Sequence, residues 1–114
     1  MRRELRLRRR KDFDNVFRKG RSWNNELLVL RSLPNDLPHN RFGFITSKRL
    51  GKAVVRNRTR RRIREAVRVL PLAASWDVVI SAKTRAATGD FHQLRASVMD
   101  LLARAKLLAN ETEA

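Results

Sequence analysis

Three segments of the chain space their apolar residues as one face of a helix. The first covers about 11–19, where two phenylalanines and a valine fall at i, i+3 and i+4, and Gly20 can end it. The second follows a short basic loop at 48–52 and reaches about residue 70, shortly before a proline. The third begins at Asp90, a good N-cap residue, with Gln93 three positions later to complete a capping box.

Extended apolar runs lie between these predicted helices. They cover about 27–33, 41–47 and 76–83, and a shorter run lies near 22–25. Within the second run, Gly43 marks a place where backbone or a ligand approaches closely. We therefore expect an α/β (α+β) two-layer sandwich, in which a small mixed sheet packs against helices in the order α-β-β-(β)-α-β-α.

The length and composition fit a single domain over 1–114. A chain of 114 residues with 42% hydrophobic residues can build one modest core, and we expect its ends, 1–9 and 111–114, to be frayed. No apolar run approaches the roughly 18 residues that cross a bilayer, and the start of the chain lacks the apolar region of a secretory signal. Cysteine is absent. These features predict a cytoplasmic protein without a membrane partner.

The net charge of +16 is extreme for this length and is unevenly placed. Residues 1–21 hold ten basic side chains against three acids, and residues 41–68 hold eleven against one. Residues 69–114 balance five basic with five acidic side chains. A folded domain with such an excess usually binds nucleic acid or an anionic membrane surface. Two segments therefore carry the predicted contacts, and the last third is predicted to be scaffold.

The second predicted helix concentrates the positive charge. Its apolar residues form one arc on a helical wheel. Arg60 lies at the edge of this arc, Arg56 lies at the helix entry, and the remainder is covered by Arg58, Arg61, Arg62, Arg64 and Arg68. A merely solvated face would mix charges of both signs to gain i, i+4 pairs, but only Glu65 is present here. A membrane-surface helix would carry bulkier apolar residues. The arginine fork suits phosphate and can stack on bases, so we predict a nucleic-acid contact.

The side chains that would perform catalysis are missing. The two histidines fall in a predicted turn and a predicted helix, so nothing pairs them for acid–base chemistry. Asp12, Asp14 and Asp36 do not form an evident carboxylate cluster for metal ions, and the glycines lack the spacing of a phosphate-binding P-loop. We therefore predict no catalytic residue, no metal site and no cofactor bound by the chain itself, and favour a binding protein over a self-sufficient enzyme.

One long motif is specific to a family. The segment 47–68 reads SKRLGKAVVRNRTRRRIREAVR and strongly resembles the signature of the bacterial ribonuclease P protein subunit. Segment 7–21, LRRRKDFDNVFRKGR, resembles the first helix of that family, and segment 76–94, WDVVISAKTRAATGDFHQL, resembles its last strand and helix. The resemblance covers almost the whole chain.

The resemblance implies both a fold and a function. It implies a left-handed βαβ crossover around the arginine-rich helix, where general rules favour the right-handed form. It also implies that the chain binds the catalytic RNA of ribonuclease P and the 5′ leader of precursor tRNA. The RNA subunit, using magnesium, would then hydrolyse the phosphodiester bond that releases the leader. No obligate protein partner is evident.

The resemblance also assigns roles to residues. The expected RNA-binding residues are Arg56, Asn57 and Arg58, supported by Arg60, Arg61, Arg62 and Arg64, with Lys48, Arg49 and Lys52 on the basic rim. Phe13 and Phe17 would line the cleft that receives the leader. The sequence departs from the family at Arg31, where an aromatic residue is common, so leader contact there would be ionic or through a stacked guanidinium. Lys52 stands where asparagine is common and adds charge.

Alternatives stay open on the sequence alone. The spacing of Phe13 and Phe17 favours core packing over a stacking surface, and Trp23 could be core or exposed. A ribosomal or other basic nucleic-acid-binding protein without a link to catalysis is the alternative function. A protein-only nuclease would need acid–base groups that the sequence lacks. Restoration of low-magnesium leader cleavage to a ribonuclease P RNA would discriminate the ribonuclease P subunit from the basic binding protein. A protein-only nuclease would be active without RNA.

Overall fold

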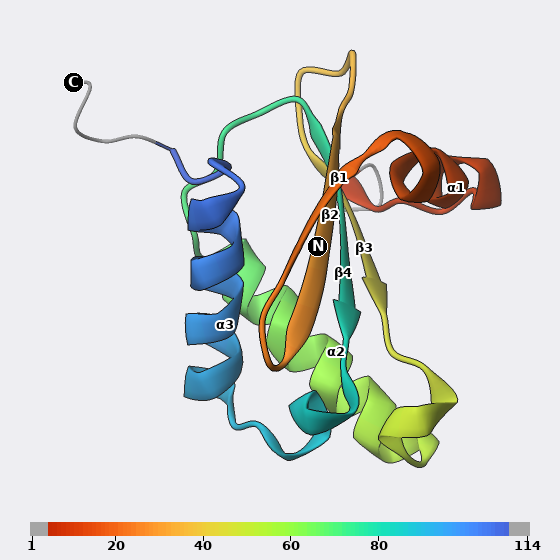
Figure 1. Ribbon diagram of the computed structural model, residues 1–114, viewed down its shortest axis with the longest axis vertical. Helices are drawn as coiled ribbons and strands as arrows, with labels where there is room; N and C mark the ends of the chain where they lie inside the picture. The colour runs from red at the N-terminus through yellow and green to blue at the C-terminus, as the bar shows by residue number, and fades with distance from the viewer. Residues whose placement is uncertain (1–4, 110–114) are drawn as a thin grey trace.

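The structure of the protein, a computed structural model, describes residues 5–109 and consists of three α-helices, four strands and short 3-10 turns over that range (Figure 1). In chain order the elements are α1 (Arg10–Lys19), β1 (Arg21–Asn24), β2 (Leu28–Pro34), β3 (Arg41–Ile45), η2 (Lys48–Leu50), α2 (Ala53–Arg68), β4 (Trp76–Ala82), η3 (Thr84–Thr88) and α3 (Phe91–Arg104). Each predicted helix and strand is present, and most begin within one or two residues of the predicted position. The expected class, α+β with a small mixed sheet, is confirmed.

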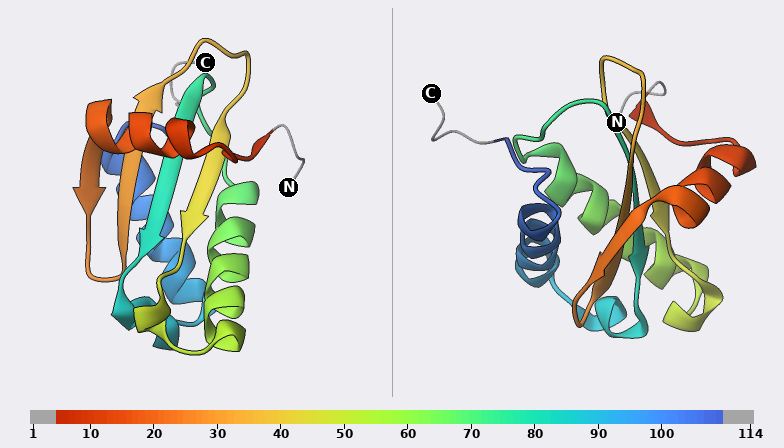
Figure 2. Two further views of the ribbon diagram at one scale, coloured as in Figure 1. Left: turned by 90° about the vertical axis from the view of Figure 1, so that its right-hand side faces the viewer. Right: turned by 45° about the horizontal axis from the view of Figure 1, so that its top comes forward.

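The four strands form one sheet in the order β1-β2-β4-β3. β1 pairs with β2 and β2 pairs with β4 in antiparallel fashion, whereas β3 and β4 are parallel. Helices α2 and α3 cover one face of the sheet, and α1 crosses the other face (Figures 1 and 2). The sheet is therefore covered unevenly, because a single short helix lies over its second face.

The connection from β3 through α2 to β4 has the unusual hand that the resemblance implies. In the left view of Figure 2, β3 and β4 both point down, β4 lies to the left of β3, and α2 lies behind the sheet. This arrangement is a left-handed crossover, whereas about 98% of such units are right-handed. Its consequence is that α2 packs beside β3, the strand at the edge of the sheet.

The main core lies between the sheet and the two helices α2 and α3. β2 and β4 alternate along their length, so Leu28, Leu30, Val78 and Ile80 are buried on this face. The helices contribute Ile63, Ala66, Val67, Leu94, Val98, Leu101 and Leu102. A second, smaller cluster lies under α1 and contains Leu7, Val16 and Val79. The small size of this second cluster leaves much of that sheet face open.

The expectation that residues 1–9 are frayed is wrong for 5–9. Leu7 is only 5% exposed, and its backbone N–H donates to the carbonyl of Phe42 at 2.9 Å. Arg6 forms a parallel bridge with the same residue, so this segment continues the sheet beyond β3. Burial of Leu7 against α1 and β4 supplies the physical reason. Residues 1–4 and 111–114 lie outside the described residues.

The start of α3 follows the predicted capping box, and apolar residues continue past its end. Gln93 N–H donates to the Asp90 carboxylate at 2.8 Å, and Asp90 N–H donates to the Gln93 side chain at 2.9 Å. The helix ends at Arg104, because the chain turns at Lys106 with a φ of 59°. Leu108 then bridges to Leu72. The apolar residues beyond 104 thus close the core from an extended segment.

Candidate nucleic-acid interface

Four of the seven arginines of α2 form two pairs on opposite flanks of the helix. Arg58 and Arg62 form one i, i+4 pair, and Arg60 and Arg64 form another that is offset by two residues. At 3.6 residues per turn, this offset rotates the second pair by about 200° around the helix axis. The buried residues Thr59, Ile63, Ala66 and Val67 occupy the arc between the two flanks. One pair therefore faces η3, and the other faces β3.

The flank toward β3 holds guanidinium groups beside the strand edge. The Nη2 atom of Arg60 donates to the Thr46 hydroxyl at 2.6 Å, and its Nη1 donates to Asn57 Oδ1 at 3.1 Å. Arg64 is half-buried and forms no hydrogen bond or ion pair with any residue of the described range 5–109. Arg64 is thus a cation placed beside the sheet without a counterion among those residues.

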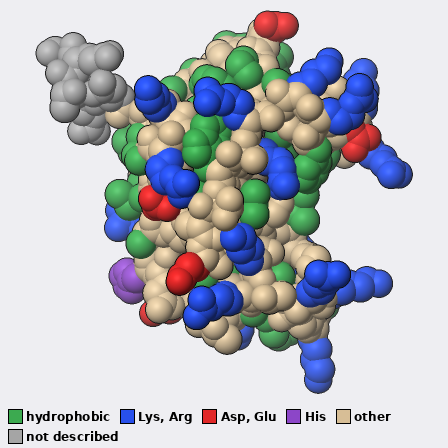
Figure 3. Space-filling model, in the orientation of Figure 1, with side chains coloured by type: hydrophobic (Ala, Val, Ile, Leu, Met, Phe, Trp, Pro, Cys, Tyr) green, Lys and Arg blue, Asp and Glu red, His purple; other side chains and the backbone are tan. Residues whose placement is uncertain are grey.

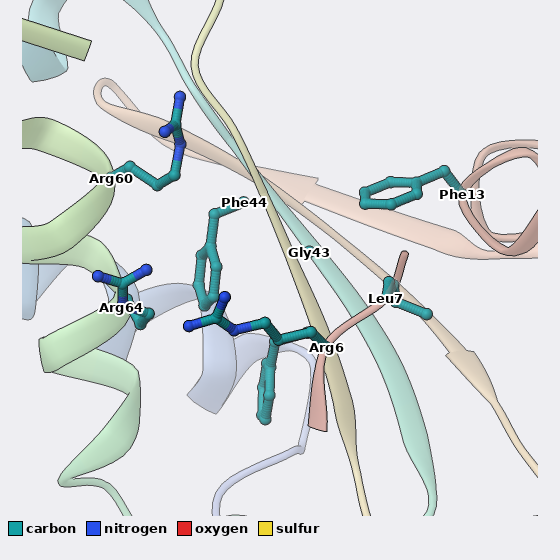
Figure 4. A pocket seen from close by; sticks show the side chains of 8 residues that line it. Arg6, Leu7, Phe13, Gly43, Phe44, Arg60 and Arg64 are labelled. Atoms are coloured by element: carbon teal, nitrogen blue, oxygen red, sulfur yellow. The ribbon is translucent and has the colours of Figure 1, made fainter. Parts of the chain in front are cut away.

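These two arginines line a pocket of about 160 Å³ at the outer edge of β3. Figure 4 shows that they reach it from α2 on one side of the strand, while Phe13 reaches it from α1 on the other. The full lining is Arg6, Leu7, Phe13, Phe42, Gly43, Phe44, Arg60 and Arg64. The phenylalanines of β3 lie nearly parallel, with ring centroids 6.2 Å apart and planes inclined by 11°. Flat apolar surface and guanidinium groups therefore meet in one place, as single-stranded RNA sites require.

Phe13 can reach this position because residue 43 is glycine. A Cβ atom at Gly43 would lie 2.4 Å from Cε1 of the Phe13 ring, closer than non-bonded carbons approach. The ring thus lies directly on the backbone of β3. The sequence predicted that backbone or a ligand approaches Gly43, but the group that approaches it is a side chain, the ring of Phe13. Phe13 is half-buried rather than fully in the core.

Phe17 lies outside the core. Its side chain is 43% exposed, so the core interpretation drawn from helical spacing is wrong for this residue. The guanidinium carbon of Arg31, on β2, lies 4.6 Å from the centre of the Phe17 ring. Such stacking favours a fixed, flat cationic surface. Phe17 and Arg31 therefore extend the aromatic and basic surface away from the pocket, across the open face of the sheet.

A buried ion network anchors the start of α1, and the sequence analysis did not identify it. Arg41 donates to both carboxylate oxygens of Asp77, at 2.9 Å and 2.7 Å, and also lies 3.5 Å from Asp12 of α1. Asn35 donates to Asp77 at 2.8 Å, and Asp77 is 5% exposed. The hydrogen bond with Asp77 raises the pKa of Arg41. Asp77 lies inside the apolar run of β4, and this was the signal available in the sequence. A buried carboxylate needs a cationic or hydrogen-bonding partner, so its position predicts such a partner.

Four further basic residues surround the start of α2. Lys48, Arg49 and Lys52 are exposed, and the Nη1 atom of Arg56 donates to the carbonyl of Gly51 at 3.2 Å. The first turn of α2 contains no acid, so this helix end adds its positive dipole to those charges. Figure 3 shows basic side chains on two projections, over α1 and over the start of α2, with a hollow between them.

The other flank points away from this hollow. Arg58 Nη2 donates to the carbonyl of Ala87 at 3.4 Å, and Arg62 Nη1 donates to that of Gly89 at 2.9 Å. Both acceptors belong to the connection between β4 and α3. Of the predicted RNA-binding residues, the structure therefore brings Arg60 and Arg64 together with Phe13. It places Arg58 and Arg62 elsewhere.

Comparisons with known proteins show the family to which the chain belongs. The family model described as Ribonuclease P matches residues 1–106. A ribonuclease P protein component of Roseiflexus castenholzii is 49% identical over 108 residues, which cover 92% of this chain and 88% of that protein. One from Dehalococcoides mccartyi (strain ATCC BAA-2266 / KCTC 15142 / 195) is 37% identical, with 99% and 94% covered. The chain belongs to the ribonuclease P protein family.

Solved structures of ribonuclease P proteins share the fold. The Staphylococcus aureus protein superimposes with a TM-score of 0.84 at 30% identity, covering 92% of this chain and 98% of that one. The Thermotoga maritima protein gives a TM-score of 0.77 at 32% identity, with 87% and 96% covered. Ribonuclease P protein components work with the ribonuclease P RNA. The alternative of an unrelated basic ribosomal protein is not favoured.

Two kinds of feature are absent from the described residues. Within residues 5–109, no three histidine or acidic side chains are grouped so that they could hold a metal ion. In the same range, no helix is long and apolar enough to cross a membrane. The candidate site is the cluster of basic residues around the start of α2 together with the β3 pocket, where guanidinium groups and phenylalanine rings meet.

Proposed function

We propose that this chain binds the catalytic RNA of ribonuclease P through the start of α2 and receives the 5′ leader of precursor tRNA at the β3 pocket. Family membership makes the chain part of a tRNA-processing ribonuclease. The observation that carries the leader assignment is the pocket itself, where Arg60 and Arg64 face Phe13 across the edge of β3.

The pocket suits a single-stranded segment better than a duplex. A volume of about 160 Å³ is enough for one planar ring system beside the phenylalanines that line the pocket. A base stacked there leaves its phosphates near Arg60 and Arg64, whose planar forks match phosphate oxygens. Duplex RNA keeps its bases inside the helix, whereas a leader presents them for stacking. Phe17 and Arg31 continue the path over the open sheet face.

The catalytic RNA is proposed to bind basic and polar residues outside the pocket. The proposed contacts are Lys48, Arg49, Lys52, Arg56, Asn57 and Arg61. Lys48, Arg49 and Lys52 surround the positive end of α2, and Arg61 is exposed without a hydrogen bond or ion pair inside the described range. Backbone phosphates are the acceptors that such a surface fits. Arg58 and Arg62 were predicted to share this role, and their direct contact with RNA stays a prediction.

The proposed division of labour leaves the chemical step to the RNA. Magnesium is expected to act with the catalytic RNA at the scissile phosphodiester. The protein side chains would bind and orient the two RNA partners, which raises the effective concentration of leader-bearing substrate at the site. The chain itself would bind no cofactor and contribute no catalytic residue.

Reconstitution tests this function. The purified chain is mixed with a bacterial ribonuclease P RNA, and cleavage of precursor tRNA is followed at a magnesium concentration too low for the RNA alone. The expected result is release of the leader at the mature 5′ end, with no cleavage by the protein alone. A matched control replaces Arg95, on the exposed face of α3, by Met and should cleave normally. If the chain binds RNA but does not restore cleavage, a general basic RNA-binding role replaces the proposal.

A further inference from the structure

The flank of α2 that faces away from the pocket is attached to the corner between β4 and α3. Arg62 donates to the Gly89 carbonyl at 2.9 Å, and Arg58 donates to the Ala87 carbonyl at 3.4 Å. Both guanidinium groups come from half-buried residues, and Gly89 is buried. Each group thus fixes a carbonyl oxygen that follows η3 or lies within it. At 2.9 Å the Arg62 contact is a charge-assisted hydrogen bond of the stronger kind, whereas the Arg58 contact at 3.4 Å is long and weaker.

The side chain of Arg58 is committed to this corner at a cost. Its Nε atom is buried and lacks a hydrogen-bond partner within the described residues. An arginine that served only as a mobile phosphate contact would keep that atom in water, because a buried unpaired donor is destabilising. The burial indicates that packing against the corner determines the position of Arg58. The shorter bond of Arg62 makes it the stronger of the two attachments.

The segment between β4 and α3, which consists of η3 and Gly89 and is called the η3 corner below, in turn supports η2, the basic turn before α2. η3 packs against both η2 and α2. η2 carries Lys48 and Arg49 on its surface and buries Leu50 underneath. Two hydrogen bonds close the turn, from Leu50 N–H to the Ser47 carbonyl at 3.1 Å and from Gly51 N–H to the Lys48 carbonyl at 3.2 Å. A turn closed by so few bonds depends on the surface beneath it.

We propose that Arg58 and Arg62 are positioning residues, which clamp the η3 corner to α2 and thereby hold η2 so that Lys48 and Arg49 face RNA. This inference rests on the proposed contact between η2 and the catalytic RNA. It divides the arginine-rich helix into an RNA flank, Arg60 and Arg64, and a clamping flank. It also explains why a single sequence motif needs so many arginines without each one reaching a phosphate.

The first test uses the protein without RNA. Amide hydrogen exchange is measured at Leu50, Gly51 and Gly89 in Arg62→Met and in Arg64→Met. Both variants lose one charge from a half-buried arginine of α2, so repulsion changes equally. Exchange at these amides should accelerate roughly tenfold in Arg62→Met, as loss of a charge-assisted hydrogen bond predicts, and should stay unchanged in Arg64→Met. If Arg62→Met does not fold, Arg62→Lys, which keeps the charge, replaces it. Unchanged exchange would overturn the clamp.

The second test asks whether the clamp acts through η2. Affinity for the catalytic RNA is measured for Arg62→Met, for the double substitution Lys48→Gln and Arg49→Gln, and for all three together. Arg62→Met should weaken binding roughly fivefold in the natural background and less than about twofold when the η2 cations are absent, which is coupling of ordinary size for residues that share one structure.

Each outcome of the second test decides a separate question. Equal losses in both backgrounds would identify Arg62 as a direct or merely structural contributor and overturn the positioning role. If removal of the η2 cations leaves affinity unchanged, η2 does not touch the RNA, and the positioning role fails while the exchange data still judge the clamp. If the natural chain does not bind the RNA at all, the proposed function fails.

Discussion

Replacement of Gly43 by Ala should disturb the leader pocket while leaving every charge in place. A Cβ atom at this position would lie 2.4 Å from Cε1 and 2.7 Å from Cζ of Phe13. Because carbon atoms in contact stay about 3.5–4.0 Å apart, the ring has to move by at least about 1 Å. β3 is paired with β4 along Arg41–Ile45, whereas Phe13 is half-buried at the rim. We therefore expect the ring, rather than the strand, to move.

The expected losses of stability and of affinity follow from the role of the Phe13 ring in the free protein and in the RNA complex. Overpacking in a core costs about 1–3 kcal/mol, and the far end of a half-buried ring can yield, so we expect about 1 kcal/mol. That corresponds to a melting temperature lower by roughly 4 °C for a domain of this size. A stacked base contributes about 1–3 kcal/mol, so affinity for leader-bearing precursor tRNA should fall roughly tenfold.

The assay compares precursor tRNA with mature tRNA, each bound to the reconstituted ribonucleoprotein. Gly43→Ala should weaken binding of the precursor alone. Phe13→Leu opens space above residue 43, so adding Gly43→Ala to Phe13→Leu should cost almost nothing further in affinity or melting temperature. Additive losses would show that the ring does not rest on Gly43, and an equal loss for mature tRNA would refute the assignment of the pocket to the leader.

Three further outcomes are expected. Arg64→Met should reduce the log–log salt slope of precursor binding by about 0.7–0.9, the share of one phosphate contact; an unchanged slope would remove Arg64 from the interface. Phe17→Leu should weaken precursor binding but leave the melting temperature nearly unchanged, because the ring is 43% exposed; a large drop in melting temperature would return Phe17 to the core. Sulfate should raise the melting temperature of the free chain above its value in chloride at equal ionic strength, beyond the increase seen in a neutral control protein, since bound anions offset the repulsion of +16.

Hydrophobic spacing was sufficient to predict the elements, and it failed where a charged sequence hides a buried residue. Leu5 and Leu7 alternate with arginines in the first residues of the chain, which is the period of a strand. The surrounding charge led to an expectation of fraying, although the alternation was the available signal. The backbone of this segment pairs with the edge of β3 at Phe42. Phe42 lies 35 residues after Leu7 in the sequence, so the pairing cannot be identified from the local pattern.

Spacing also could not separate the roles of residues that share one helix. A wheel places Arg58 and Arg62 opposite Arg60 and Arg64, but it does not say which flank meets protein. That depends on the left-handed crossover, which sets β3 beside one flank and the η3 corner beside the other. General rules favour the opposite hand, so this part of the site was accessible only through the resemblance to a known family.

The charge of the arginine-rich helix therefore overstates its number of phosphate contacts. Of its seven arginines, five donate to groups of the chain itself: Arg56, Arg58, Arg60, Arg62 and Arg68. Arg61 and Arg64 have no such partner among residues 5–109, so they can bind phosphate without breaking a bond. Each of the other five already commits one or two of its five N–H donors within the protein. A phosphate contact there is left with fewer donors and a more constrained side chain, so its net contribution would be smaller. The salt dependence contributed by α2 should thus fall well below the value that seven independent contacts would give.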